Sequence, residues 1–300
     1  MELIIGLRGS KLSLVQGESL QKMLSDLGLS SSLKVIKTTG DKRSQGAKLK
    51  HAQDKQEWVA EIEEALQLKE IDLALHSGKD VPVGISPGSK IEALSNIASR
   101  EDIFISSKSF GSVEEIPEGL KIGTSSERRK KQLQRLFKAP EILPIRGNID
   151  TRLKKLEEGS LDGIVLARAG IERLGLTPSS SIQLPFLTAV AQGILAIQYR
   201  EEDLNIAKLI PSLTNVEAQL VFATERLFIE KIGADCHSAV GVRAQIKDDL
   251  LTLKCDVFQP DGGRFFEGEL TGDIAESGLL VNQLAEELFS ELGYDLFSGA

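Results

Sequence analysis

Strand-like and helix-like patterns alternate through the first part of this chain. The run LIIGLR (3–8) predicts a strand, and apolar residues then recur at helical spacing over 14–27. LKVIKTTGD (33–41) predicts a strand followed by a loop, a helical face follows over 58–66, and IDLALHS (71–77) predicts a buried strand. Alternation of this kind favours a mostly parallel sheet with helices packed on its faces.

A second unit with the same alternation begins near residue 96. Its predicted strands are DIFISS (102–107), LKIGTSS (120–126), EILPIRGN (141–148) and LDGIVLAR (161–168), with helices over 127–137 and 149–159. The segment FLTAVAQGILAIQYR (186–200) is apolar and rich in small residues, which predicts that it returns the chain to the first unit. We therefore expect a first domain at 1–95 with 190–213, and a second domain at 96–189.

The pattern changes after residue 213. A helix predicted over about 216–231 precedes three strand-like segments, GVRAQIKDD, LLTLKCDVFQ and GGRFFEGELTG, with KDD and PDGG as hairpin turns. A final amphipathic helix is predicted over 278–293. Residues 214–300 therefore form a small α+β domain with a three-stranded antiparallel sheet, after two doubly wound α/β domains.

Composition excludes several classes of function. The net charge of −8 disfavours a general nucleic-acid binder, whose affinity rests on cations against phosphates. Two cysteines and three scattered histidines support neither a disulfide framework nor a metal site. The run MELIIGLRGSK lacks the pattern expected of a signal peptide, and no apolar run approaches membrane length. We expect a cytoplasmic protein with no metal, nucleic-acid or membrane partner.

Arginines and hydroxyls cluster where a strand meets a helix in KIGTSSERRKKQL. Thr124, Ser125 and Ser126 offer hydroxyls and backbone N–H groups at a helix start, and Arg128 and Arg129 add positive charge there. This arrangement is typical of an anion site. A serine-capped helix with a solvated basic face explains the same residues, so both interpretations stand.

Three further loops repeat this chemistry at strand ends. Arg8 and Ser10 follow the first strand, Lys79 and Asp80 follow the strand 71–77, and Arg146 lies in PIRGNIDTRL with Arg152 in the next helix. Open α/β sheets bind ligands at such ends. A salt bridge between Lys79 and Asp80, and surface pairing of Arg152 with a nearby glutamate, are the structural alternatives. Four anion-friendly loops favour a polyanionic ligand in a cleft between the two domains.

These motifs identify a family resemblance. RGSKLSLVQ, HSGKDVP, GTSSERR, RGNIDTRL, LARAGIERLGL, AQGILAI and a late cysteine loop occur in the order and spacing of the hydroxymethylbilane synthase (porphobilinogen deaminase) family. The resemblance covers nearly the whole chain. It implies three domains, the first two resembling periplasmic binding proteins, and a transferase that condenses four porphobilinogen molecules in haem and chlorophyll synthesis. It also implies a dipyrromethane cofactor held by a thioether to a cysteine.

The resemblance assigns roles to individual residues. Asp80 matches the catalytic acid/base, which assists the loss of ammonia and the deprotonation of the attacked ring carbon. Cys236, in the small-residue loop KIGADCHSAVGV, matches the cofactor anchor, whereas Cys255 lies in an apolar periodic run typical of a buried thiol. Gln16 and Lys55 match positions that line the cleft. The positions that hold substrate and cofactor carboxylates are matched by Arg8, Ser10, Lys79, Thr124, Ser125, Ser126, Arg128, Arg129, Arg146, Arg152 and Arg173.

Two functions from different classes remain at this point. The first is hydroxymethylbilane synthase, expected as a monomer whose partner is the small molecule porphobilinogen. The second is a solute-binding or sensor protein that kept the anion cleft and lost catalysis, because a fold alone does not fix a function. The presence of both Asp80 and Cys236 favours the enzyme, since a receptor needs neither.

Overall fold

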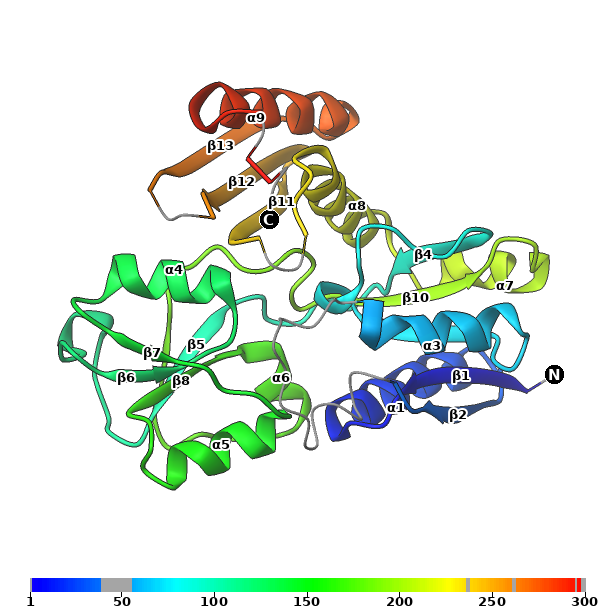
Figure 1. The fold of residues 1–300 in the computed structure, drawn as a ribbon. Helices are drawn as coiled ribbons and strands as arrows, with labels where there is room; N and C mark the ends of the chain where they lie inside the picture. Colours follow the sequence, from blue (N-terminus) through cyan, green and yellow to red (C-terminus); the bar gives the residue numbers. More distant parts are fainter. Residues whose placement is uncertain (1, 39–55, 236–237, 261–262, 295, 298–300) are drawn as a thin grey trace. The chain divides into compact units, whose positions relative to one another are not determined.

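The computed structural model describes residues 2–38, 56–235, 238–260, 263–294 and 296–297, and Figure 1 shows their course. Spatial contacts between residues divide the chain into two compact units. Unit 1 comprises residues 1–98 and 193–222, and unit 2 comprises 99–192 and 223–300. The chain therefore passes between the units three times, twice within the α/β part.

Unit 1 is built on a five-stranded sheet with the order β2-β1-β3-β10-β4. β1 pairs in parallel with both β2 and β3, and β10 pairs antiparallel with β3 and β4. β10 comes from the segment that the sequence predicted would return to the first unit, so that prediction is confirmed. The strands are β1 (Leu3–Arg8), β2 (Ser31–Ile36), β3 (Leu73–Ser77), β4 (Ser89–Ala93) and β10 (Leu195–Arg200).

Helices pack on both faces of this sheet. Alternate residues of β1 explain why, since Ile5 and Leu7 join one apolar cluster with Leu20 of α1, while Ile4 packs against the cluster that contains Ile62 of α3. The helical elements are α1 (Lys11–Asp26), α3 (Gln56–Gln67), the 3₁₀ turn η1 (Gly78–Asp80), α7 (Leu204–Leu209) and η3 (Ile210–Ser212). Helix α8 (Val216–Lys231) begins in unit 1 and ends in unit 2.

Unit 2 contains a second five-stranded sheet, with the order β7-β6-β8-β5-β9. β6 is parallel to β7 and β8, and β5 is antiparallel to β8 and β9. Both sheets therefore share one topology, four strands in one direction and one in the opposite direction next to the edge strand. The strands are β5 (Asp102–Ser106), β6 (Lys121–Gly123), β7 (Glu141–Leu143), β8 (Gly163–Ala167) and β9 (Ser181–Gln183).

Two apolar clusters flank the second sheet. Leu133 of α4 (Glu127–Leu136) packs with Phe104 and Val165 on one face of the sheet. Leu156 of α5 (Ile149–Glu157) packs with Ile164 on the other face. These clusters fix the helices that follow the strand ends, which positions the loops between them. The helical elements are η2 (Val113–Glu115), α4 (Glu127–Leu136), α5 (Ile149–Glu157) and α6 (Arg168–Arg173).

The last part of unit 2 is an antiparallel sheet of order β11-β12-β13, against which helix α9 packs (Figure 1). Asp248 and Asp249 both adopt positive φ, 51° and 61°, as a tight two-residue hairpin turn requires. This confirms the predicted KDD turn and the three-stranded sheet. The elements are β11 (Val240–Lys247), β12 (Leu250–Phe258), β13 (Phe265–Asp273), η4 (Ile274–Glu276) and α9 (Ser277–Leu292).

Candidate functional site

The predicted site residues of unit 1 follow β1 and β3. Ser10 caps α1, because its hydroxyl accepts a hydrogen bond from the N–H of Ser13 at 3.2 Å. Lys79 and Asp80 lie partly buried in η1, directly after β3. Since β1 and β3 are parallel neighbours, their carboxyl ends meet at one edge of the sheet, which brings Arg8 and Ser10 to the same edge as Asp80.

Gln16 is held beneath that edge. Its side chain is 3 % exposed, and its amide exchanges hydrogen bonds with the hydroxyl of Ser77 at 3.1 and 3.3 Å. Ser77 is the last residue of β3 and directly precedes the turn that carries Asp80. The amide of Gln16 therefore connects α1 to the start of that turn.

In unit 2 the three hydroxyls after β6 make local hydrogen bonds. Ser126 caps α4 by accepting from the N–H of Arg129 at 3.4 Å, Thr124 accepts from the N–H of Ser126 at 3.2 Å, and Ser125 donates to the carbonyl of Ile145 at 2.8 Å. The serine-capped helix foreseen as an alternative is thus present. Capping and anion binding are compatible, because the cap leaves further N–H groups of the first turn without helical partners.

The next loop carries Arg146, which is exposed and follows β7. Because β6 and β7 are parallel neighbours, Arg146 lies at the same edge of the sheet as Thr124–Ser126. Arg152 donates from Nε to the carbonyl of Gly147 at 2.8 Å, which ties α5 back to this loop. Burial lowers the pKa of Arg173 at the end of α6.

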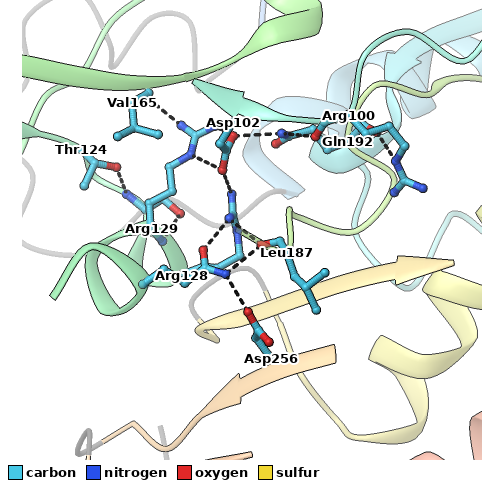
Figure 2. A network of polar contacts seen from close by, with 11 residues as sticks. Arg100, Asp102, Thr124, Arg128, Arg129, Val165, Leu187, Gln192 and Asp256 are labelled. Atoms are coloured by element: carbon cyan, nitrogen blue, oxygen red, sulfur yellow. Dashed lines mark hydrogen bonds and ion pairs between the residues drawn. The ribbon is translucent and has the colours of Figure 1, made fainter. Parts of the chain in front are cut away.

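Arg128 and Arg129 form a buried ion-pair cluster with Asp102, which Figure 2 shows. Arg129 donates to both oxygens of Asp102, from Nε at 3.1 Å and from Nη2 at 2.6 Å, and Arg128 donates to Oδ2 at 2.8 Å. Gln192 adds a hydrogen bond at 2.9 Å, and Asp102 is fully buried. Burial acts to raise the pKa of Asp102, but the two guanidiniums outweigh it, so the pKa lies well below its usual value.

This cluster extends to the antiparallel sheet of unit 2. Arg128 donates from Nη1 to the side chain of Gln132 at 2.8 Å and to the carbonyl of Leu187 at 2.9 Å, and Gln132 donates to Asp256 of β12 at 3.1 Å (Figure 2). Burial raises the pKa of Asp256. The two arginines expected to hold ligand carboxylates are therefore already fixed by protein groups on several sides.

A second buried ion pair lies nearby in the same unit. Arg100 donates from Nη2 to Glu225 of α8 at 2.6 Å, with side-chain exposures of 6 % and 0 %. Glu225 also accepts from the N–H groups of Ala191 at 2.8 Å and Ala244 of β11 at 2.7 Å. One carboxylate thus connects α8 to a strand and to the segment before β10.

Sequence reasoning missed these partners of the arginines. Asp102 opens the apolar strand DIFIS and Arg100 stands two residues before it, so charged residues at the start of a buried strand were the available signal. Glu225 gave a weaker signal, a carboxylate in the middle of a largely apolar helix. None of the three belongs to a strand-end loop, the part of the sequence that carries the predicted ligand-binding residues.

Cys236 and Lys55 lie outside the described residues. Cys255 is a free thiol with 0 % exposure, and burial raises its pKa well above the usual value, which confirms the predicted buried thiol. Within the described ranges no cluster of histidine, cysteine and carboxylate side chains is arranged to hold a metal ion. Nor does any helix among those residues combine the length and apolar character needed to cross a membrane.

Comparison with known proteins gives one consistent family. Residues 3–208 match the family model described as porphobilinogen deaminase, dipyromethane cofactor binding domain, and residues 220–290 match the porphobilinogen deaminase C-terminal domain. Among solved structures, the second substrate binding domain of a putative amino acid ABC transporter from Streptococcus pneumoniae aligns with a TM-score of 0.44 at 12 % identity, covering 78 % of this chain and 95 % of that one.

Relatives of full length carry the same name. A protein from Clostridium botulinum named porphobilinogen deaminase is 40 % identical over 294 residues, covering 96 % of this chain and 99 % of its own. One from Carboxydothermus hydrogenoformans, also named porphobilinogen deaminase, is 36 % identical over 295 residues, covering 97 % and 94 %. With both family domains matched in order and relatives aligned from end to end, this chain belongs to the porphobilinogen deaminase family.

Proposed function

We propose that this protein is a hydroxymethylbilane synthase. It joins four porphobilinogen molecules head to tail and releases linear hydroxymethylbilane for porphyrin synthesis. In each condensation the bond between the aminomethyl carbon and nitrogen breaks, ammonia leaves, a carbon–carbon bond forms to the free ring carbon of the preceding pyrrole, and that carbon loses its proton. Release of the product would hydrolyse the bond between the methylene carbon of the first porphobilinogen unit and the ring carbon to which it was joined: the methylene carbon would gain the hydroxyl group of water, and the ring carbon would regain a proton. The observation that carries the proposal is the match of both family domains along the chain.

Asp80 is the proposed acid/base of this reaction. It lies partly buried at the carboxyl end of β3, where a side chain is both fixed and open to ligand. A carboxylate there is able to stabilise positive charge that develops on a pyrrole as the amine departs, and to accept the proton lost from the attacked carbon. Its neighbour Lys79 is proposed to contact a ligand carboxylate.

The pyrrole carboxylates are proposed to contact arginines and hydroxyls of both units. Each pyrrole carries an acetate and a propionate, so a growing chain needs several fixed cations. Arg146 supports this assignment, because it is an exposed guanidinium at the sheet edge that also carries Thr124–Ser126. Arg128 and Arg129 support it in a different way: two guanidiniums share the one negative charge of Asp102, so the cluster keeps an excess of positive charge that favours an anion. The proposed carboxylate-binding residues are Arg8, Ser10, Lys79, Thr124, Ser125, Ser126, Arg128, Arg129, Arg146, Arg152 and Arg173.

The dipyrromethane cofactor is proposed to be attached through Cys236. When bound it supplies the ring carbon to which the first porphobilinogen is joined. The positive charge around Arg128, Arg129 and Arg146 fits such a group, whose carboxylates require cations. Gln16 and Lys55 are proposed to line the binding site of this cofactor. We also propose that the enzyme is a cytoplasmic monomer that needs no metal.

The test combines product formation with intact mass. Purified protein supplied with porphobilinogen is expected to form hydroxymethylbilane, which closes with loss of water to uroporphyrinogen I and is measured as uroporphyrin I after oxidation with added iodine. The protein is also expected to carry the mass of a dipyrromethane group. A protein that binds porphobilinogen reversibly, forms no product and has the mass of the bare chain would instead be the inactive anion-binding protein. Those three results together would overturn the proposal.

A further inference from the structure

A buried chain of hydrogen bonds in unit 1 brackets the turn that carries Asp80. His76, two residues before that turn in β3, contacts Gln198 of β10 through Nε2 at 3.1 Å. Gln198 in turn donates to Glu63 of α3 at 2.7 Å. Glu63 accepts from both the N–H and the hydroxyl of Ser86, at 3.1 and 2.7 Å, six residues after Asp80. The chain thus joins the strand before the turn to the loop after it.

The direction of each hydrogen bond follows from the carboxylate at one end. The carboxylate of Glu63 only accepts hydrogen bonds, and it receives three, from the N–H and the hydroxyl of Ser86 and from Gln198. The group of Gln198 that faces Glu63 is therefore its amide NH₂. The same NH₂ donates to the hydroxyl of Ser89 at 2.8 Å. The amide oxygen of Gln198 therefore faces His76, and we infer that Nε2 of His76 carries the proton. Every donor in the chain then has an acceptor.

Burial makes this arrangement rigid. Gln198 is 0 % exposed and His76 is 6 % exposed, so neither side chain has water as an alternative partner. Within the turn, the N–H of Gly78 donates to the carbonyl of Ile194 at 2.8 Å, and the N–H of Val81 donates to the carbonyl of Gly78 at 3.2 Å. The backbone around Asp80 is thereby held on one side by Ile194, the residue directly before β10, while Glu63 holds the loop that follows.

We propose that Gln198 and Glu63 are positioning residues for Asp80: together they hold β3 and the loop at Ser86, and so fix the turn from which the Asp80 carboxylate projects. This inference rests on the proposed function of Asp80. Neither residue is assigned a contact with the reacting atoms. Their effect is geometric, since a displacement of about 1 Å at a reacting group is enough to cost on the order of a hundred-fold in rate.

The experiment uses three variants of the full chain carrying its cofactor. Gln198→Met removes the amide, Glu63→Gln removes the negative charge at similar size, and Ser86→Ala removes one hydroxyl only. The matched control is Gln219→Met, also in unit 1, whose amide oxygen accepts from the N–H of Ala93 in β4 at 2.8 Å without contacting the Asp80 turn. For each protein kcat, KM, thermal midpoint and intact mass are measured with porphobilinogen.

We expect kcat to fall about ten- to a hundred-fold in Gln198→Met and Glu63→Gln, and a few-fold in Ser86→Ala, with KM changed less than three-fold. Combining Ser86→Ala with Glu63→Gln is expected to lower kcat little further than Glu63→Gln alone, because both act through one contact. Gln219→Met is expected to lower the thermal midpoint and leave kcat within two-fold.

Two results would overturn the inference. One is a kcat within two-fold of the wild type in the cofactor-loaded variants. The other is an equal fall in kcat in Gln219→Met when its thermal midpoint is lowered as much as that of the test variant, because the fall would then follow from lost stability alone. If Gln198→Met does not fold, Ser86→Ala decides, because it removes only a hydroxyl. An inactive wild type with the mass of the bare chain would count against the proposed function itself, so the two failures are distinguishable.

Discussion

Arg129 donates hydrogen bonds to both carboxylate oxygens of Asp102, with Nε 3.1 Å from Oδ2 and Nη2 2.6 Å from Oδ1. Arg128 shares the same carboxylate, so a single buried negative charge fixes the direction of two adjacent guanidiniums. Arginines that bind ligand carboxylates need such fixed directions, since their planar fork recognises an anion only in a restricted geometry. Asp102 thereby links the stability of unit 2 to the arrangement of its cations.

Replacing Asp102 by asparagine is expected to destabilise the protein strongly. The change leaves two buried guanidiniums without their anion, for which breaking a buried pair costs about 3–5 kcal/mol in the free energy of unfolding. Urea denaturation at pH 7 measures this difference. Asp162→Asn is the control: its Oδ2 accepts one hydrogen bond, from the N–H of Lys121, and we expect a loss of about 1 kcal/mol. A loss as small in Asp102→Asn would contradict the role assigned to the cluster.

The same carboxylate predicts a dependence of stability on pH. Because the pKa of Asp102 is lowered in the folded protein, its stabilisation is fully present above its unfolded pKa, about 3.9, and is lost as pH falls through the lower folded value. The difference in unfolding free energy between wild type and Asp102→Asn should therefore be constant from pH 7 to about 5 and shrink below about 4. Denaturation curves at several pH values give that difference, and one that grows towards low pH would show that the sign is wrong.

Asp80→Asn is expected to lower kcat by about a hundred- to ten-thousand-fold, the range typical of general acid–base groups. Asparagine keeps the size of the side chain and loses the charge that stabilises a cationic pyrrole. The thermal midpoint should change little, because Asp80 is only partly buried. Steady-state assays with porphobilinogen measure the effect. Activity within ten-fold of the wild type would remove Asp80 from the mechanism.

The two cysteines are expected to behave differently. Cys236→Ser should abolish the added mass of the cofactor, whereas Cys255→Ser should keep it, because the Cys255 thiol is buried with a raised pKa. For the same reason Cys255 should resist alkylation until the protein is unfolded. Intact mass spectrometry separates these outcomes, and cofactor mass that persists in Cys236→Ser would mean that the attachment point is elsewhere.

Arg146→Gln is expected to raise KM for porphobilinogen or weaken cofactor loading by about ten-fold or more, since it removes a charge-assisted contact to a carboxylate. Arg135→Gln makes the same substitution in α4, where the Arg135 guanidinium lies 3.6 Å over the ring of Phe265. That control is expected to alter stability and leave KM unchanged. Equal KM values together with equal cofactor loading in the two variants would show that Arg146 does not contact the ligand.

Much of the fold follows from periodicity. The continuous apolar runs in LIIGLR and IDLALHS predicted strands buried on both faces, and the return of Leu195–Arg200 to the first sheet was predicted from its apolar, small residues. The direction of that strand was not predicted, because hydrophobic pattern is the same for parallel and antiparallel pairing in a strand buried on both sides. The split between second and third domains stays a prediction, since contacts place residues 99–192 and 223–300 together in unit 2.

The candidate site divides in a similar way. Strand-end loops carry a local signal, so Ser10, Asp80 and Arg146 were selected from the sequence, and the parallel strands bring them to sheet edges. The partners that hold such residues are distant in sequence: Asp102 is 27 residues from Arg129, and Glu63 is 135 residues from Gln198. No spacing rule connects such pairs, because tertiary packing alone brings them together.

The position of β10 between β3 and β4 has a consequence for biosynthesis. As the chain leaves the ribosome, residues 89–93 emerge long before Leu195–Arg200, the strand to which they pair. Through that interval β4 has no place in the first sheet, and β3 lacks its neighbour on one side. The sheet of unit 1 is therefore completed only after the strands of the second sheet have been translated. Of the two α/β domains, the amino-terminal one is thus the second to have all the strands of its sheet.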